Sequence, residues 1–187
     1  MAVSDSFDRA DSGSLGANWT NCLGGFSIVS NEAQGTDFAH NIAAYTAVSW
    51  NNDQHAETVV SSSSDGGPAV RASATGGGQA YVATANIGTS ACRIVLFSGG
   101  SETMLTDDFC PWAAGDVIGL DVVGTTLTVT KNGTTVQTHT DATIASGSAG
   151  IKSYNTTNHI ASWSATGDIG GGGGGATIPR MALLGVG

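Results

Sequence analysis

An antiparallel β-sheet is predicted most directly by Leu120-Asp-Val-Val-Gly-Thr-Thr-Leu-Thr-Val-Thr-Lys-Asn-Gly-Thr-Thr-Val-Gln137, the centre of a β-meander expected over residues 116–151. Gly124-Thr125 fits a two-residue type II′ turn, which requires glycine at its first central position, and Asn132-Gly133 is typical of a type I′ turn. Apolar and polar residues alternate on both sides of each turn. The pattern therefore predicts three strands joined by two tight hairpins.

The two turns also determine which residues face each other across the strands. A slip of one residue would move every side chain to the other face, so agreement between turns and hydrophobic pattern supports the register. The expected pairs are Val122 with Leu127, Leu120 with Val129, Val129 with Val136, and Lys131 with Thr134. One face then carries Leu120, Val129 and Val136, and the solvent-facing side carries Thr128, Thr130, Thr135 and Gln137.

The rest of the chain repeats this spacing of short apolar runs and turn residues. Further strands are expected at residues 26–30, 43–50, 56–60, 69–74, 80–87, 92–98, 103–106 and 160–165. Clusters of Gly, Asn, Asp and Ser separate these runs, and no long helical period is present. A length of 187 residues with 28 glycines suits one all-β domain, a two-sheet antiparallel sandwich whose core holds Trp19, Phe26, Phe97 and Trp163.

Several of these segments resemble a known fold family. The run from Gly124 to Gly133, followed by Gly147-Ser-Ala-Gly-Ile151, is similar to the late strands of concanavalin A-like, laminin-G-type jelly rolls. The opening run from Ser6 to Asp11, with Asn18-Trp19, resembles the first strand of such domains in bacteriophage virion and bacterial surface proteins. The resemblance covers residues 4–167 and implies a jelly-roll sandwich.

The chain divides at six consecutive glycines. Residues 1–169 are expected to form the sandwich, and residues 170–175 a polyglycine linker that loses too much backbone entropy on ordering to form an element. Residues 176–187 form an apolar C-terminal peptide, interpreted either as a disordered end or as a flexible arm that docks on a neighbouring subunit. The docking residues would be Ile178, Met181, Leu183, Leu184 and Val186.

Composition excludes several classes of partner. A formal net charge of −9 with six scattered basic residues disfavours nucleic acid, because phosphate contacts need clustered Lys and Arg. It also disfavours attachment to an anionic membrane. No signal peptide or membrane-spanning run is visible. The expected location is therefore the host cytoplasm, followed by assembly into a virion.

Catalytic patterns are missing from the sequence. Concanavalin-like glycosidases use two nearby carboxylates, arranged in the best-known glucanases as Glu-x-Asp-x-(x)-Glu. The chain has three glutamates, Glu32, Glu57 and Glu102, and none lies in such a pattern. The four histidines are isolated in sequence, and His139 is expected opposite Thr126 on the solvent-facing side of the meander. The protein is therefore predicted not to be an enzyme.

No cofactor or metal is expected. The cysteines at 22, 92 and 110 are widely spaced, which favours free thiols over a Cys92–Cys110 bridge. Loop oxygens suited to calcium occur at Asp37, Asn51, Asn52, Asp53, Asp107 and Asp108, but they form no ligand series. Asp and Asn are also common in turns for backbone reasons, and this second interpretation is preferred.

Glycan binding would require exposed aromatic rings beside amide or carboxylate groups. The candidates are Trp50 with Asn51 and Asn52, and Tyr154 with Asn155. Each aromatic residue has an alternative structural role in the core.

Two function hypotheses follow. The first is a non-enzymatic bacteriophage virion structural protein, a capsid decoration or tail-associated protein held to other virion proteins and to its own copies by the C-terminal arm. The second is a carbohydrate-binding, lectin-like module on a virion or cell surface.

Overall fold

The protein is a β-sandwich in a computed structural model that describes residues 1–61 and 65–167. The polyglycine linker and the C-terminal peptide, with its five expected docking residues, lie outside the described residues. Within the described part, the regular structure consists of strands and one short 3₁₀ turn, Thr75–Gly77. The expected all-β antiparallel sandwich is confirmed, and no helix in the described part is long and apolar enough to cross a membrane.

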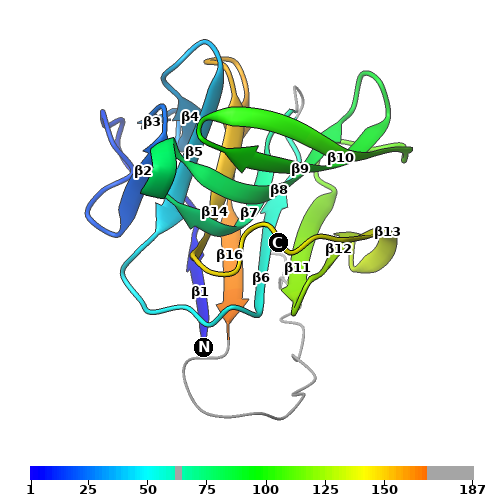
Figure 1. Ribbon diagram of the computed structural model, residues 1–187. Coiled ribbons are helices and arrows are strands. Elements are labelled where there is room, and N and C mark those ends of the chain that lie inside the picture. Colours follow the sequence, from blue (N-terminus) through cyan, green and yellow to red (C-terminus); the bar gives the residue numbers. More distant parts are fainter. Residues whose placement is uncertain (62–64, 168–187) are drawn as a thin grey trace.

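The first sheet has six antiparallel strands. In spatial order they are β1 (Ala2–Asp5), β16 (Trp163–Gly167), β6 (Gln54–Val59), β11 (Val117–Val123), β12 (Thr126–Lys131) and β13 (Thr134–Thr140). Of these, β1, β16 and β6 run vertically in Figure 1. Alternate residues point to the core, as in β6, where Ala56 is buried while His55 and Glu57 lie on the outer face. This alternation leaves the outer face of the sheet polar.

The second sheet has seven antiparallel strands. Their order is β10 (Ser101–Phe109), β9 (Ala91–Ser98), β8 (Gln79–Asn86), β7 (Gly67–Ser73), β14 (Ser148–Tyr154), β5 (His40–Tyr45) and β2 (Trp19–Leu23). A small third sheet joins β15 (His159–Ile160), β4 (Glu32–Gly35) and β3 (Phe26–Val29) near the upper end of the sandwich in Figure 1.

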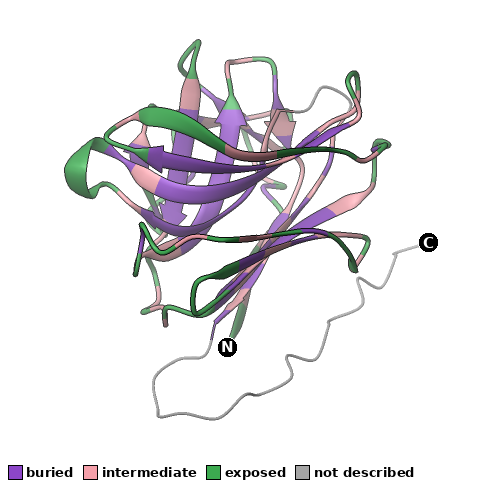
Figure 2. Ribbon diagram, turned by 45° about the vertical axis from the view of Figure 1, so that its right-hand side comes forward, coloured by how far each residue is buried: buried purple, intermediate pink, exposed green. Residues whose placement is uncertain are grey.

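The main core lies between the two large sheets, and Figure 2 shows buried residues along the strands and exposed ones mostly in the loops. An aromatic cluster fills one part of it: the ring of Trp19 lies 4.8 Å from that of Trp163 and 5.8 Å from that of Phe7. Trp19, Trp163, Phe26 and Phe97 are all buried, as expected. The three cysteines are free thiols, as preferred from their spacing.

The seven-stranded sheet is buried on its other face as well. Ala69, Ala80 and Val82 occupy the middle of that face, and the larger Ile42 and Phe97 lie on its flanks. In a flat sheet, β5 and β9 would be four strand spacings apart, roughly 19 Å. The rings of His40 on β5 and Phe97 on β9 are nevertheless only 4.9 Å apart. The sheet is therefore strongly curved, and large flanking side chains fill its concave face above small central ones.

The first hairpin of the meander forms as predicted. Val122 pairs with Leu127 and Leu120 with Val129. Positive φ angles at Gly124 (58°), Asn132 (47°) and Gly133 (80°) are those required by the two expected turns. The strand expected at 56–60 forms as β6, with the bounds Gln54–Val59.

The register of the second hairpin differs from the prediction. Lys131 pairs with Thr134, but a bulge shifts the pairing so that Val129 faces Gln137. Gln137 is buried and donates hydrogen bonds to the Cys92 carbonyl oxygen and, at 2.6 Å, to Asp108 Oδ2. Val136, expected in the core, is the extra residue of the bulge and is 36% exposed. A polar bridge between the sheets thus replaces the expected Val129–Val136 pair.

The same shift changes the position of His139. It pairs with Leu127 instead of Thr126, and it is half-buried rather than on the solvent-facing side. Strand boundaries also differ from the prediction, by one to three residues in most strands and by more in two of them. The strand expected at 43–50 ends at Tyr45, and the one expected at 160–165 is divided into β15 and β16.

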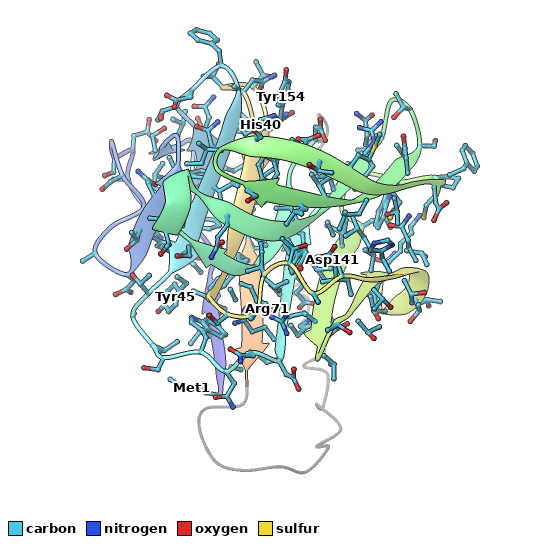
Figure 3. All side chains as sticks on the ribbon, in the orientation of Figure 1. Met1, His40, Tyr45, Arg71, Asp141 and Tyr154 are labelled. Carbon is cyan, nitrogen blue, oxygen red and sulfur yellow. The ribbon has the colours of Figure 1, made fainter. Side chains whose placement is uncertain are left out.

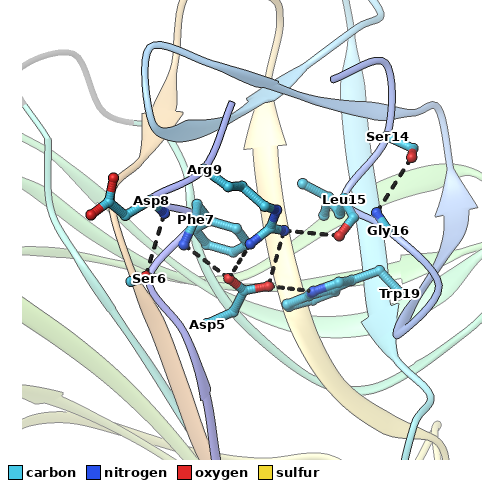
Figure 4. Close-up of polar contacts among 9 residues, drawn as sticks. All are labelled: Asp5, Ser6, Phe7, Asp8, Arg9, Ser14, Leu15, Gly16 and Trp19. Atoms are coloured by element: carbon cyan, nitrogen blue, oxygen red, sulfur yellow. Dashed lines mark hydrogen bonds and ion pairs between the residues drawn. The ribbon is translucent and has the colours of Figure 1, made fainter. Parts of the chain in front are cut away.

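The opening sequence motif forms a polar anchor around Asp5 (Figure 4). The Asp5 carboxylate accepts hydrogen bonds from Arg9 Nη1 at 2.6 Å, the Trp19 indole at 2.9 Å and the Phe7 amide at 2.9 Å. Burial opposes ionisation, but these donors outweigh it and lower the pKa of Asp5. The anchor ties the N-terminal segment to the aromatic core.

A buried arginine joins the loops at the lower end of the sandwich (Figure 3). The Arg71 guanidinium donates hydrogen bonds to the carbonyl oxygens of Asn52, Ile144 and Gly124, which belong to three different loops. Its own backbone amide donates to Gln54 Oε1 at 2.9 Å. Arg71 has φ +51° at a shift in the β7 register, which turns its side chain toward these loops.

Replacing Gly133 by valine should destabilise the domain by about 1–3 kcal/mol, because a β-branched residue resists a positive φ angle. Urea unfolding measures the change. Gly13→Val is the matched control, since Gly13 has open space around it and no positive φ angle. Equal midpoints for the two variants would contradict the assigned turn.

Candidate functional site

The expected glycan-binding residues lie at opposite ends of the sandwich. Figure 3 shows Tyr154 and His40 at the upper end and Tyr45 and Met1 at the lower end. Trp50 belongs to the lower end, because its indole nitrogen donates to the Tyr45 carbonyl oxygen at 2.7 Å. The groups at 50–52 and at 154–155 therefore cannot contact the same sugar unit.

The lower group has mainly structural contacts. Trp50 is half-buried, and its ring lies 6.5 Å from that of Trp163. The Asn51 carbonyl oxygen accepts a hydrogen bond from Gln54, and that of Asn52 accepts one from Arg71. These contacts hold the loop between β5 and β6 in place, so the upper end is the stronger candidate for ligand binding.

At the upper end, one buried side chain fixes the loop at residues 36–39. Asn41 Oδ1 accepts hydrogen bonds from the amides of Gly25 and Asp37, at 3.2 and 3.0 Å. Its Nδ2 donates to the carbonyl oxygens of Asp37 and Ala39, at 3.1 and 3.2 Å. Because Asn41 is fully buried, three of these hydrogen bonds hold the loop from below, and the fourth ties it to Gly25.

This fixed loop presents an exposed aromatic ring. Phe38 is 88% exposed, although it lies between two residues held by Asn41. The neighbouring turn carries Tyr154, which is 37% exposed, and the Asn155 amide donates to the Ala39 carbonyl oxygen at 2.7 Å. Phe38 and Tyr154 thus stand on adjoining segments that are hydrogen-bonded to each other. We call Phe38, His40 and Tyr154 the aromatic rim.

His40 supports the rim from the concave side. Its ring lies 5.2 Å from the Tyr154 ring, and its Nδ1 lies 3.3 Å from Glu102 Oε2 on β10. Burial and the positive charge of Lys152 lower the pKa of His40, while Glu102 opposes this shift. The lowered pKa favours the neutral form of the His40 imidazole.

Lys152 lies beneath the same rim. Its ammonium nitrogen is 5.5 Å from the centre of the Tyr154 ring and donates to the Asp65 carbonyl oxygen at 2.7 Å. The side chain is 1% exposed, and burial lowers its pKa despite the nearby Asp65 carboxylate. A cation under one face of the ring leaves the opposite face as the side available to a ligand.

The three glutamates each approach a histidine, not another glutamate. Glu102 faces His40, Glu32 lies 3.2 Å from His159, and Glu57 lies 3.5 Å from His55. His55 also contacts Asp121 Oδ1 at 2.7 Å, on the outer face of the six-stranded sheet. Strand pairing places Glu32 near His159 and Asp121 opposite His55, and Glu57 is two residues from His55 on the same strand. Glu102 and His40 lie on β10 and β5, which are not paired, so the curvature of the sheet brings them together.

Asp107 and Asp108, expected in a loop, lie on strand β10, and three of the six side chains considered for calcium have structural partners. Asp53 accepts from the Gly124 amide, Asp107 pairs with Arg93, and Asp108 accepts from Gln137. Within residues 1–61 and 65–167, no cluster of three or more His, Cys, Asp or Glu side chains could hold a metal ion.

Sequence reasoning identified Tyr154 and Asn155 but not Phe38 or His40. Phe38 could have been recognised from the sequence as an exposed ring. It stands between Asp37 and Ala39 in a polar loop, where an apolar side chain is not expected to be buried. The Asn155 side chain accepts hydrogen bonds from Thr157, so it shapes the turn that carries Tyr154.

No protein-family model and no curated protein sequence matches this chain. Solved structures do match it. The carbohydrate-binding module CBM66 from Bacillus subtilis aligns with a TM-score of 0.61 and 13% identity over 83% of this chain and 96% of that module. The carbohydrate recognition domain of Emp47p aligns with a TM-score of 0.54 and 11% identity over 90% and 95% of the two chains.

An enzyme shares the architecture too. A β-1,3-1,4-glucanase derived from a mouse hindgut metagenome aligns with a TM-score of 0.55 and 8% identity, over 90% of this chain and 99% of the enzyme. At such low identities these likenesses show the fold alone, a jelly-roll sandwich of the type found in carbohydrate-binding modules and glycosidases.

The comparisons correct the first function hypothesis. A bacteriophage virion structural protein was expected, yet the similar structures reported above are two carbohydrate-binding domains and a glucanase, and they provide no link to a virion. The prediction of a virion role was wrong because it relied on a flexible arm and on the missing catalytic pattern. Neither feature distinguishes a virion protein from a binding module.

The contacts of His55 with Asp121 and Glu57 predict that the stability of the fold depends on pH. Burial alone would lower the pKa of His55, but hydrogen bonds to Asp121 and Glu57 raise it to about 9. Because the pKa of His55 is higher in the folded state than the unfolded value near 6.5, protonation of His55 stabilises the fold. This contribution is complete below pH 6.5 and is lost as the pH rises through about 9. Asp121→Asn should cost about 1.5–3 kcal/mol at pH 7 and flatten the decline in stability between pH 7 and 10.

Urea unfolding at several pH values measures this effect, with exposed Asp8→Asn as the control. Parallel curves for the wild type and Asp121→Asn would show that His55 is not held as an imidazolium between the two carboxylates.

Proposed function

We propose that the protein is a carbohydrate-binding module whose ligand lies on the aromatic rim. The observation that carries this proposal is Phe38, an 88% exposed ring on a loop fixed by the buried Asn41. Exposing a large apolar side chain on an ordered loop contributes nothing to folding, which is typical of a binding position. The jelly-roll architecture shared with carbohydrate-binding domains supports the proposal.

The rim suits the amphipathic shape of a sugar. The faces of Phe38 and Tyr154 offer apolar surface to the C–H side of a pyranose ring, and Asp37 and Glu102 offer carboxylate oxygens to its hydroxyl groups. Asn41 and His40 hold these groups before the ligand arrives, which reduces the ordering cost of binding. The net charge of −9 favours a neutral glycan over an anionic one.

The proposed function is that the protein binds a glycan and does not hydrolyse it. Hydrolysis by two carboxylates requires an acid and a base on the two sides of one glycosidic bond. Here the three glutamates lie on different strands, β4, β6 and β10, and each faces a histidine. Incubation with the polysaccharide that binds best should release no reducing ends, and release that disappears on replacing a single Glu would overturn this part.

Removing the Phe38 or the Tyr154 ring should weaken glycan binding. Stacking one face of a ring buries roughly 75 Å², worth about 2 kcal/mol, so Phe38→Ala and Tyr154→Ala should each reduce affinity about 30-fold. Calorimetric titration with the best neutral oligosaccharide from a glycan array provides the measurement.

Phe109→Ala is the matched control, because Phe109 is 80% exposed but lies at the far end of β10. Full affinity in Phe38→Ala and Tyr154→Ala would move the ligand away from the rim. The absence of binding to every neutral glycan would remove the proposed function itself.

A further inference from the structure

Strand β10 forms one edge of the seven-stranded sheet, and β9 is the one strand of residues 1–61 and 65–167 that pairs with it. The Cys110 amide, just after β10, donates to the Ser90 carbonyl oxygen at 2.8 Å and therefore points to the β9 side. Backbone groups point to alternate sides along a strand, so the N–H and C=O groups of Asp107 and Phe109 point away from β9. The described part of the chain provides no partner strand for these outward groups.

The side chains of β10 suit an apolar partner. The strand has nine residues, contains neither lysine nor proline, and exposes Met104 and Phe109. These two side chains share a face, because they pair with Val95 and Ala91, which are an even number of residues apart on β9. A long edge strand with exposed apolar side chains is a site where another strand can add.

The charges on β10 determine which sign the partner must carry. The strand has three carboxylates, Glu102, Asp107 and Asp108, and no basic side chain. Arg93 lies 3.1 Å from Asp107 Oδ1 and neutralises only one of them. Pairing with β10 of a second copy would add three more carboxylates at the same edge. The edge therefore suits a segment that is apolar and basic.

The C-terminal peptide, residues 176–187, has this composition. It contains the five apolar docking residues named from the sequence, and Arg180 is its one charged side chain. A proline inside a strand is tolerated only where the missing N–H would face away from the neighbouring strand. Pro179 therefore restricts how this peptide can pair.

The peptide can reach β10 of its own chain. Strand pairing places Gly167, the last described residue, in one row with His139, across four strand spacings or roughly 19 Å. Gln137, two residues along β13 from His139, donates to Asp108 Oδ2 on the opposite sheet. With about 10 Å between the sheets, Gly167 and Asp108 are about 23 Å apart. Residues 168–177 span up to roughly 33 Å, which is enough to bring the peptide to the end of β10 that carries Asp108.

One antiparallel register satisfies these requirements. Ile178 lies opposite the Phe109 ring, and Arg180 lies opposite the Asp107 carboxylate. Pro179 then stands between two residues that bond to β10, at a position whose N–H would face solvent, so its missing donor costs no hydrogen bond. A slip of one residue would turn the Pro179 position toward β10 and lose that bond.

We propose that the C-terminal peptide adds as a strand to β10 of its own chain, beginning with Ile178 opposite Phe109. A peptide tethered to the same molecule has an effective concentration of about a millimolar, so it competes well against a separate copy. Its pairing closes the edge and prevents association of β10 with other molecules. This role is independent of glycan binding at the aromatic rim.

Amide hydrogen exchange of the full chain, followed by NMR, tests the proposal. After correction for intrinsic rates, the Asp107 and Phe109 amides should exchange at least about tenfold more slowly than the exposed Gly13 amide. Ile178→Asp adds a carboxylate beside an acidic strand and should remove this protection at both positions. Ala176→Asp is the matched control, because it adds the same charge outside the paired residues and should leave the protection intact.

Each outcome decides for or against the pairing. The Asp108 amide, which points toward β9, should stay protected in every variant and reports that the sandwich is intact. Fast exchange of the Asp107 and Phe109 amides in the full chain, or protection that survives Ile178→Asp, would overturn the proposal. Protection that increases over about a twentyfold range of protein concentration would assign the edge to a second copy, which also overturns it.

Discussion

Burial of both faces of the seven-stranded sheet is the constraint on which the rest of the structure depends. One face packs against the six-stranded sheet, and the other is so curved that side chains of β5 and β9 contact each other across it. Small side chains at Ala69 and Ala80 make this curvature possible, because large flanking residues such as Phe97 can then close over them. The concave face is consequently filled with the protein's own side chains.

A filled concave face leaves the ends of the sandwich for recognition. The lower end is consolidated by Arg71, which joins three loops through their carbonyl oxygens. The upper end is built differently, because Asn41 fixes the loop backbone while leaving the Phe38 side chain in solvent. Rigid backbone beneath exposed rings is the arrangement that binding to a sugar face requires. The difference between the two ends gives the proposed function its location.

The sequence could predict those features of the fold that depend on residues close together in the chain. The turns at Gly124 and at Asn132-Gly133 set the pairing of Val122 with Leu127, and the structure confirms both. The bulge at Val136 could not be predicted, because it depends on contacts of Gln137 with Cys92 and Asp108, residues distant in sequence.

The candidate site also combines features that can be predicted from nearby residues with features that depend on the fold. Tyr154 could be selected from its polar neighbours, but whether it lies at the same end as Trp50 depends on strand order. The exposure of Phe38 depends on the buried amide of Asn41, three residues away on β5, and nothing in the sequence distinguishes Asn41 from an asparagine in a loop.

Chemical-shift mapping by NMR with the best-binding neutral oligosaccharide tests the central claim most directly. Ligand-induced shifts should be concentrated at residues 36–40 and 154–157, while shifts centred on the concave face at Val82 and Val95, or on residues 50–52, would contradict the account.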